Sequence, residues 1–174
     1  MSDLFQNSVE AGASLVELGL IQDENFLVIQ IVDNGSGMTS EELVRAQDPF
    51  YSDGKKHPGR KVGLGLPFVV QTTQSTGGSF EIFSTKGQGT RLKVGFNLKH
   101  WDTPPLGDLA LALTQIVGLP GQFEAKITRS LMGREWSVNR SELQEVLGTF
   151  DDPGAWGLLK QFFESSEEEL KTGE

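Results

Sequence analysis

Residues 26–38, FLVIQIVDNGSGM, decide the fold: an apolar run ends on Asp33 and passes directly into a glycine-rich loop. Such a run predicts a strand. A carboxylate at the end of a strand can accept a hydrogen bond from an exocyclic amine such as that of adenine. Gly35 and Gly37 would let the backbone pass close to a flat ring, and Met38 would add an apolar wall. The alternative is an ordinary turn with an Asx cap.

A polar stripe is predicted on the helix that opens the chain, at residues 2–11. Asp3 and Asn7 are four residues apart, so they share one face of that helix. Asn7 can offer a neutral carbonyl oxygen to Mg²⁺, a hard cation that prefers oxygen ligands. Asp3 can orient or deprotonate a water molecule. The same spacing also fits a solvated stripe on an amphipathic helix, so this motif alone leaves both interpretations open.

A glycine-rich stretch, KVGLGLP at residues 61–67, precedes a predicted helix. Gly63 and Gly65 would expose backbone N–H groups where that helix begins, which favours an anion site for phosphates. Residues 51–62 hold four lysines and arginines and one acid, in a chain that is acidic overall. We therefore expect a basic lid at residues 48–62. A solvated loop is the alternative, because a lone glycine-rich loop is a weak signal.

A fourth stretch, KGQGT at residues 86–90, predicts a hairpin turn between two strands. The turn ends on Thr90, whose hydroxyl can bridge to Asp33 or to a base through water. Taken alone, this stretch fits a plain glycine turn equally well.

The order and spacing of the four stretches resemble the N, G1, G2 and G3 boxes of the superfamily of gyrase, chaperone, histidine kinase and mismatch-repair ATPases. The resemblance covers about residues 3–97. It implies a Bergerat-type fold, an α/β fold in which a two-layer α+β sandwich contains a mixed sheet. It also implies that ATP and Mg²⁺ bind between the helices and the sheet.

The resemblance also implies roles for single residues. Asn7 would ligate Mg²⁺, and Asp33 would accept from the adenine amine. Asp3 is the catalytic candidate, although it stands where the hydrolytic branches usually carry the longer glutamate. The other nucleotide-binding candidates are Gly35, Gly37, Met38, Lys61, Gly63, Leu64, Gly65, Leu66 and Thr90.

Composition excludes several other classes of protein. The 174 residues hold 24 acids and 15 bases, a formal net charge of −9, which argues against a nucleic-acid partner. The absence of cysteine excludes thiolate metal sites, and two histidines are too few for a multi-histidine site. No apolar run is long enough to span a membrane, so we expect a soluble, cytoplasmic protein.

The chain divides near residue 101. We expect residues 1–100 to form a histidine-kinase-like domain that is short at its amino-terminal end for this family. Residues 101–174 predict a helix, a hairpin and further helices, ending in an acidic tail that frays into solvent. Residues 99–110, KHWDTPPLGDLA, resemble small stand-alone bacterial proteins of the histidine-kinase-like ATPase type. The three tryptophans, Trp101, Trp136 and Trp156, are expected in the core.

Three functions follow as hypotheses. The first is an ATPase or kinase that acts on a separate protein partner. The second is a regulatory module that senses nucleotide with little catalysis, and the third is a scaffold that binds none. Neither His57 nor His100 stands in a predicted phosphoacceptor helix, so autophosphorylation within this chain is not expected.

Overall fold

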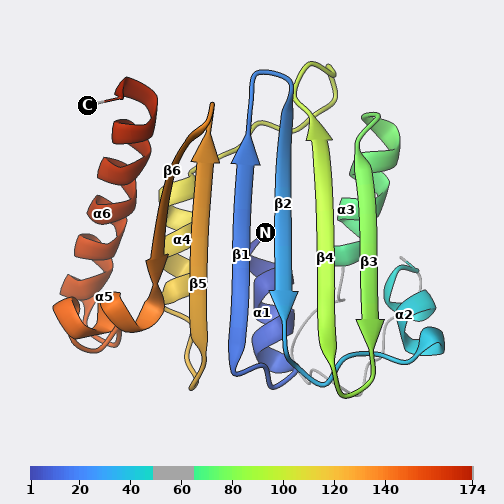
Figure 1. Ribbon diagram of the computed structural model, residues 1–174, viewed down its shortest axis with the longest axis horizontal. Helices are drawn as coiled ribbons and strands as arrows, with labels where there is room; N and C mark the ends of the chain where they lie inside the picture. The colour runs from blue at the N-terminus through green and yellow to red at the C-terminus, as the bar shows by residue number, and fades with distance from the viewer. Residues whose placement is uncertain (49–64, 174) are drawn as a thin grey trace.

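The computed structural model describes residues 1–48 and 65–173. It shows one six-stranded sheet with the strand order β3-β4-β2-β1-β5-β6 (Figure 1). Neighbouring strands are antiparallel except β1 and β5, which are parallel, so the sheet is mixed. The predicted α/β fold with a mixed sheet is therefore confirmed.

The helix expected at residues 2–11 and the strand expected from residue 26 are present, and so are the hairpin expected around residues 86–90 and the helices and hairpin expected beyond residue 101. The strands are β1 (Leu15–Gln22), β2 (Phe26–Asp33), β3 (Ser79–Thr85), β4 (Gly89–Asn97), β5 (Glu124–Leu131) and β6 (Arg134–Asn139). The helices in the described residues are α1 (Ser2–Glu10), α2 (Ser40–Ala46), α3 (Gly65–Ser75), α4 (Leu109–Val117), α5 (Arg140–Leu147) and α6 (Pro153–Thr172).

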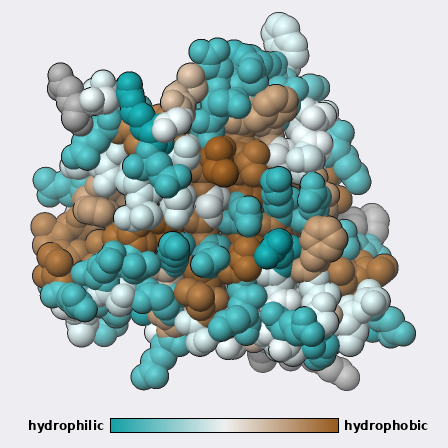
Figure 2. Space-filling model, in the orientation of Figure 1, coloured by the Kyte–Doolittle hydropathy of each residue, from teal (hydrophilic) through white to brown (hydrophobic). Residues whose placement is uncertain are grey.

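The helices α1, α3 and α4 lie behind the sheet in Figure 1, and no described helix covers its other face. The strands alternate accordingly: in β1, Val16, Leu18 and Leu20 are buried against the helices. On the uncovered face, Figure 2 shows apolar side chains among charged ones. The exposed residues there include Ile21 and Phe83.

The last third of the chain completes this sheet. Strand β5 pairs with the edge of β1 that β2 leaves free, so that Leu18 lies opposite Ile127. Helix α6 packs on α4, and its Leu159 and Phe163 enter the same core as Phe5 of α1. The two parts that the sequence predicts, residues 1–100 and 101–174, therefore share one sheet and one core.

Two buried arginines hold the carboxyl-terminal part in place. The Arg129 side chain on β5 donates from Nε to Glu167 of α6 at 3.1 Å, and from Nη2 to Gln22 Oε1 of β1 at 2.6 Å. Arg140 donates to the carbonyl oxygens of three residues at and after the end of α4, namely Val117, Leu119 and Phe123. Both guanidinium groups satisfy backbone or side-chain acceptors that would otherwise be buried without partners.

Two expectations are wrong in detail. The acidic tail does not fray, because α6 continues to Thr172 and buries both Glu167 and Leu170. Trp101, on a turn after β4, is 98% exposed and Trp156 of α6 is 37% exposed, so neither is in the core. Trp136 is half-buried and touches the ring of Phe163, as expected. None of the described helices has the length and apolar character needed to cross a membrane.

Replacing Arg129 with methionine should lower the free energy of unfolding by about 3–5 kcal/mol, because Glu167 would stay buried without its counter-ion. Urea unfolding followed by circular dichroism measures this loss. The control Lys160→Met breaks the exposed pair of Lys160 with Asp108 and should change stability very little. The double variant Arg129→Met with Glu167→Leu should recover most of the loss. A double variant as unstable as Arg129→Met alone would contradict unpaired charge as the cause.

Candidate functional site

The described parts of the predicted motifs meet at one end of the inner strands, where β2 ends and β4 begins (Figure 1). Asp33 lies directly opposite Thr90 in the register of β2 and β4. Ser8 of α1 donates to Asp33, and the amino-terminal residue of α3, Gly65, lies beside Asp3 of α1. We call the residues Ser8, Asp33, Gly35, Gly37, Met38, Ser84 and Thr90 the Asp33 site.

Asp33 is buried, with 8% of its surface exposed, and its carboxylate accepts three hydrogen bonds. Oδ1 accepts from the backbone N–H of Gly35 at 2.9 Å and of Thr90 at 3.2 Å. Oδ2 accepts from the Ser8 hydroxyl at 2.7 Å. A carboxylate offers about four acceptor positions, so one acceptor position on Oδ2 remains for a further donor.

The loop after β2 is clamped on both sides. The backbone N–H of Ser36 donates to Ala11 at the end of α1, and the Ser36 carbonyl accepts from Gly87 in the β3–β4 turn. Gly37 has a φ of +57°, and a Cβ at this position would collide with the Thr85 carbonyl. A Cβ on Gly35 would lie 3.0 Å from Asp33 Oδ1. Gly35 is therefore required by the approach of the loop to Asp33, and Gly37 by the approach of the loop to Thr85.

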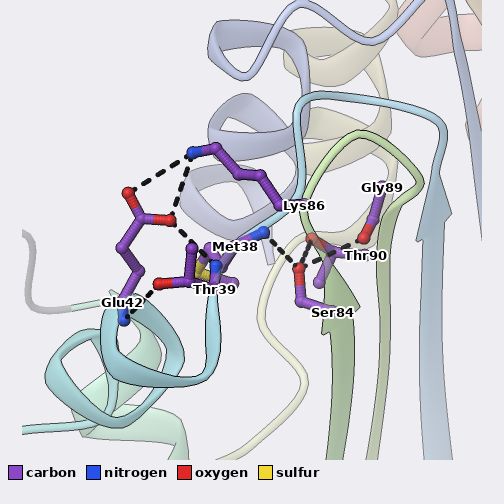
Figure 3. A network of polar contacts seen from close by, with 7 residues as sticks. All are labelled: Met38, Thr39, Glu42, Ser84, Lys86, Gly89 and Thr90. Atoms are coloured by element: carbon purple, nitrogen blue, oxygen red, sulfur yellow. Dashed lines mark hydrogen bonds and ion pairs between the residues drawn. The ribbon is translucent and has the colours of Figure 1, made fainter.

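Met38, Ser84 and Thr90 form a second polar cluster beside Asp33 (Figure 3). The Met38 N–H donates to Ser84 Oγ at 2.8 Å, and that oxygen lies 2.9 Å from the Thr90 hydroxyl. The same view shows Lys86 paired with Glu42, whose side chain also caps α2 through the Thr39 N–H. The start of β4 is thus joined through Ser84 to the residue before the Thr39 cap of α2, and the turn before β4 is joined to α2 through Lys86 and Glu42.

The Mg²⁺ candidate lies on the exposed side of α1. Asp3 and Asn7 are both exposed, while Leu4, Phe5 and Ser8 on the other side are buried. A Cβ on Gly65 would lie 3.3 Å from Asp3 Cβ, which places the start of α3 against this stripe. The backbone at a helix start favours anions, so phosphate can approach Asp3 and Asn7 from α3.

Part of the predicted site cannot be placed. Lys61, Gly63, Leu64 and the predicted lid beyond Asp48 lie outside the described residues. Leu66 is half-buried and packs against the core. Within the described ranges, no group of three or more histidine, aspartate or glutamate side chains is arranged to hold a metal ion. A cation here would depend on Asn7 and on ligands that arrive with it.

Two residues of the site were missed by the sequence analysis, Ser8 and Ser84. Ser8 follows Asn7 directly and lies on the buried side of α1, where a hydroxyl requires a partner. Ser84 follows from the hairpin turn, since counting back from KGQGT puts it opposite Thr90. Both were visible as small polar residues at inward-facing positions.

Comparison with known proteins identifies a family for the first part of the chain. The family described as "Histidine kinase-, DNA gyrase B-, and HSP90-like ATPase" matches residues 1–100. The sensor histidine kinase YxdK of Bacillus subtilis (strain 168) is 30% identical over 86 residues, which are 48% of this chain and 26% of that protein. Sporulation kinase C of the same organism is 30% identical over 99 residues, which are 56% of this chain and 22% of the kinase. The chain thus spans about a quarter of the length of these relatives.

Gly37→Ala should destabilise the protein far more than Gly87→Ala. Both glycines have positive φ, but a Cβ on Gly87 meets nothing within 4 Å, whereas a Cβ on Gly37 meets the Thr85 backbone. Gly87→Ala should cost about 1–2 kcal/mol from backbone strain alone. Gly37→Ala should cost on the order of 4 kcal/mol or more, because a strand or the loop must move. Urea unfolding of the two variants tests this, and equal losses would show that the clamp on the loop is unimportant.

Proposed function

The chain belongs to the family of histidine kinase-, DNA gyrase B- and HSP90-like ATPases and carries an ATP-binding domain of that kind, and we propose that it binds ATP with Mg²⁺ to act on a separate protein. The action would be phosphoryl transfer to that partner or ATP hydrolysis. The cofactors and the partner are part of the proposal. So are the roles of Asp3 and Asn7.

The remaining acceptor position on Asp33 carries the proposal. Ser8, Gly35 and Thr90 come from three separate segments and fix the carboxylate, so its free position cannot turn away. A rigid, buried acceptor favours a ligand with a donor at that point, and the exocyclic amine of adenine is such a donor. A ligand with a carbonyl there would place two acceptors against each other.

The exposed stripe of α1 supports the placement of the phosphates. Mg²⁺ usually reaches a protein with substrate phosphates and keeps several waters, so a single amide ligand from Asn7 fits it. When bound, the ion would neutralise phosphate charge. Gly65 at the start of α3 would present backbone N–H groups to the phosphates. Asp3 would orient the attacking hydroxyl or water and accept its proton.

A regulatory module is the second candidate, favoured by the contacts of α2. The Lys86 ammonium lies 3.1 Å from Glu42 Oε2, and Glu42 caps α2. Lys86 sits in the turn that leads to Thr90, so a base held at Asp33 and Thr90 would also stabilise the position of α2. In this alternative, bound nucleotide changes a partner surface without turnover.

Titration calorimetry with ATP and Mg²⁺ tests the site through Asp33→Asn. The amide oxygen can still accept from Gly35 and Thr90, and the amide nitrogen can donate to the Ser8 hydroxyl, so the local structure should persist. The variant would present a donor to the adenine amine, and binding should weaken at least about tenfold. The matched control is Asp23→Asn at the other end of β2, where the side chain accepts two backbone N–H groups in a turn. Equal affinities for parent and Asp33→Asn would contradict the proposal.

Turnover of ATP by Asp3→Ala separates the two candidates. If Asp3 acts as the base, the alanine variant should lose at least about 100-fold in rate with little change in ATP affinity. Asp3→Glu keeps a carboxylate and should retain activity. A parent that binds ATP, together with an alanine variant as fast as the parent, would remove Asp3 from the chemistry and favour the regulatory module.

A further inference from the structure

Four large apolar side chains are exposed at the end of the sheet opposite Asp33. Trp101 is 98% exposed, Met132 56%, Ile21 55% and Phe26 47%. They lie in or beside the ends of β1, β2, β4 and β5, which are neighbouring strands and reach the top of Figure 1 together. We call these four residues the Trp101 patch. It spans four strands, about 15 Å, and large apolar side chains gathered at one exposed place are typical of a protein interface.

The turn that carries Trp101 is held by its own hydrogen bonds. Thr103 Oγ1 donates to the Asn97 carbonyl at 2.6 Å, and the Asp102 N–H donates to His100 Nδ1 at 3.2 Å. The Trp101 ring is therefore presented on a fixed turn that leaves it uncovered. A tryptophan presented in this way loses little conformational entropy when a partner covers it, which suits it to be a binding hot spot.

The backbone at Met132 gives an independent indication. Met132 has a φ of +53°, the only positive φ of a non-glycine residue in the described part of the chain. Glycine and asparagine adopt this left-handed conformation more readily than methionine does. Methionine at this exposed turn therefore carries both backbone strain and exposed apolar surface, and contact with a partner would offset the second.

The charged residues beside the patch indicate a second copy of the chain as the partner. Asp23 and Glu24 lie in the turn between β1 and β2, and Lys99 lies in the turn after β4. The two turns touch, because the Leu98 N–H donates to the Asn25 carbonyl at 2.7 Å. Glu24 and Lys99 are both exposed, and neither makes an ion pair with another residue in the described ranges.

A two-fold axis between these adjoining turns would reverse their order in the second copy. The acidic turn of each copy then faces the basic turn of the other, so that Glu24 meets Lys99 twice in one interface. The same rotation brings Trp101 of each copy toward Phe26 of the other, which buries the most exposed ring against an apolar surface.

We propose that two copies of this chain associate head to head through the Trp101 patch, with Trp101 as the anchor and with Glu24–Lys99 pairs between the copies. The inference does not depend on the proposed function. Because Asp33 lies at the far end of β2, both candidate sites would point away from the interface and stay open to a separate protein.

Sedimentation equilibrium of the full chain tests the association. The parent should form a pair with twice the mass of one chain, and Trp101→Ala should weaken that pair at least about 30-fold, the effect of losing a hot spot. The matched control is Phe83→Ala, which removes an aromatic ring that is 65% exposed near the Asp33 end of β3. The control should leave the pair unchanged. Both rings are largely exposed, so both variants should fold like the parent.

Charge reversal tests which surfaces meet. Glu24→Lys and Lys99→Glu each place like charges at both contacts between the copies, so each variant alone should associate at least about tenfold more weakly than the parent. Mixing the two variants puts opposite charges together again at both contacts, and the mixture should recover the association of the parent. Glu24 is chosen over Asp23 because the Asp23 carboxylate accepts the N–H groups of Asn25 and Phe26 and so fixes the turn.

Three results would overturn the proposal. The first is a parent that stays monomeric up to about 1 mM, where even a millimolar affinity would be visible. The second is an association that Trp101→Ala does not weaken, because the copies would then meet elsewhere. The third is a mixture of Glu24→Lys and Lys99→Glu that associates no better than either variant alone.

Discussion

The burial of one carboxylate organises this end of the molecule. Removing Asp33 from water carries a large cost unless donors replace the solvent, and the three donors come from α1, the loop after β2, and β4. These segments must therefore converge wherever Asp33 is placed. Gly35 follows from the same requirement, because a Cβ there would lie 3.0 Å from Asp33 Oδ1, while Gly37 is required by the close approach of the loop to the Thr85 backbone. The remaining acceptor position on Asp33 is a by-product of that convergence, and the proposed adenine recognition uses it.

The second organising feature is the sharing of one sheet by both parts of the chain. Strand β5 covers the edge of β1, and Arg129 joins β1, β5 and α6 through its fork of donors. Arg140 similarly closes the carboxyl-terminal end of α4. The family match ends at residue 100, yet the core continues through Leu159 and Phe163. In this protein the residues beyond the matched domain thus form part of its packing.

The sequence predicts local structure well and long-range placement poorly. The apolar run from residue 26 predicted the strand that ends on Asp33, and the resemblance of the four motifs to the family's nucleotide-binding boxes implied that Asp33 and Thr90 belong to one site. The parallel pairing of β1 with β5 was not predictable, because strands more than a hundred residues apart carry no local signal of their partner. The same reason explains Glu167: its charge favours solvent until Arg129 is placed against it. Trp101 was misjudged because aromatic residues are usually buried, while its turn is held by polar contacts such as that of Thr103 with Asn97.

The parallel β1–β5 pair has a consequence for synthesis on the ribosome. The last residue in the chain that donates to Asp33 is Thr90. The carboxylate can therefore have all three of its donors once β4 has emerged. The outer edge of β1 must wait for β5, and about a hundred residues separate the end of one strand from the end of the other. At ~5–20 residues per second, the nascent chain exposes that edge for about 5–20 s. An unpaired edge of this kind invites pairing with other chains, so this interval is when the growing polypeptide most needs chaperone protection.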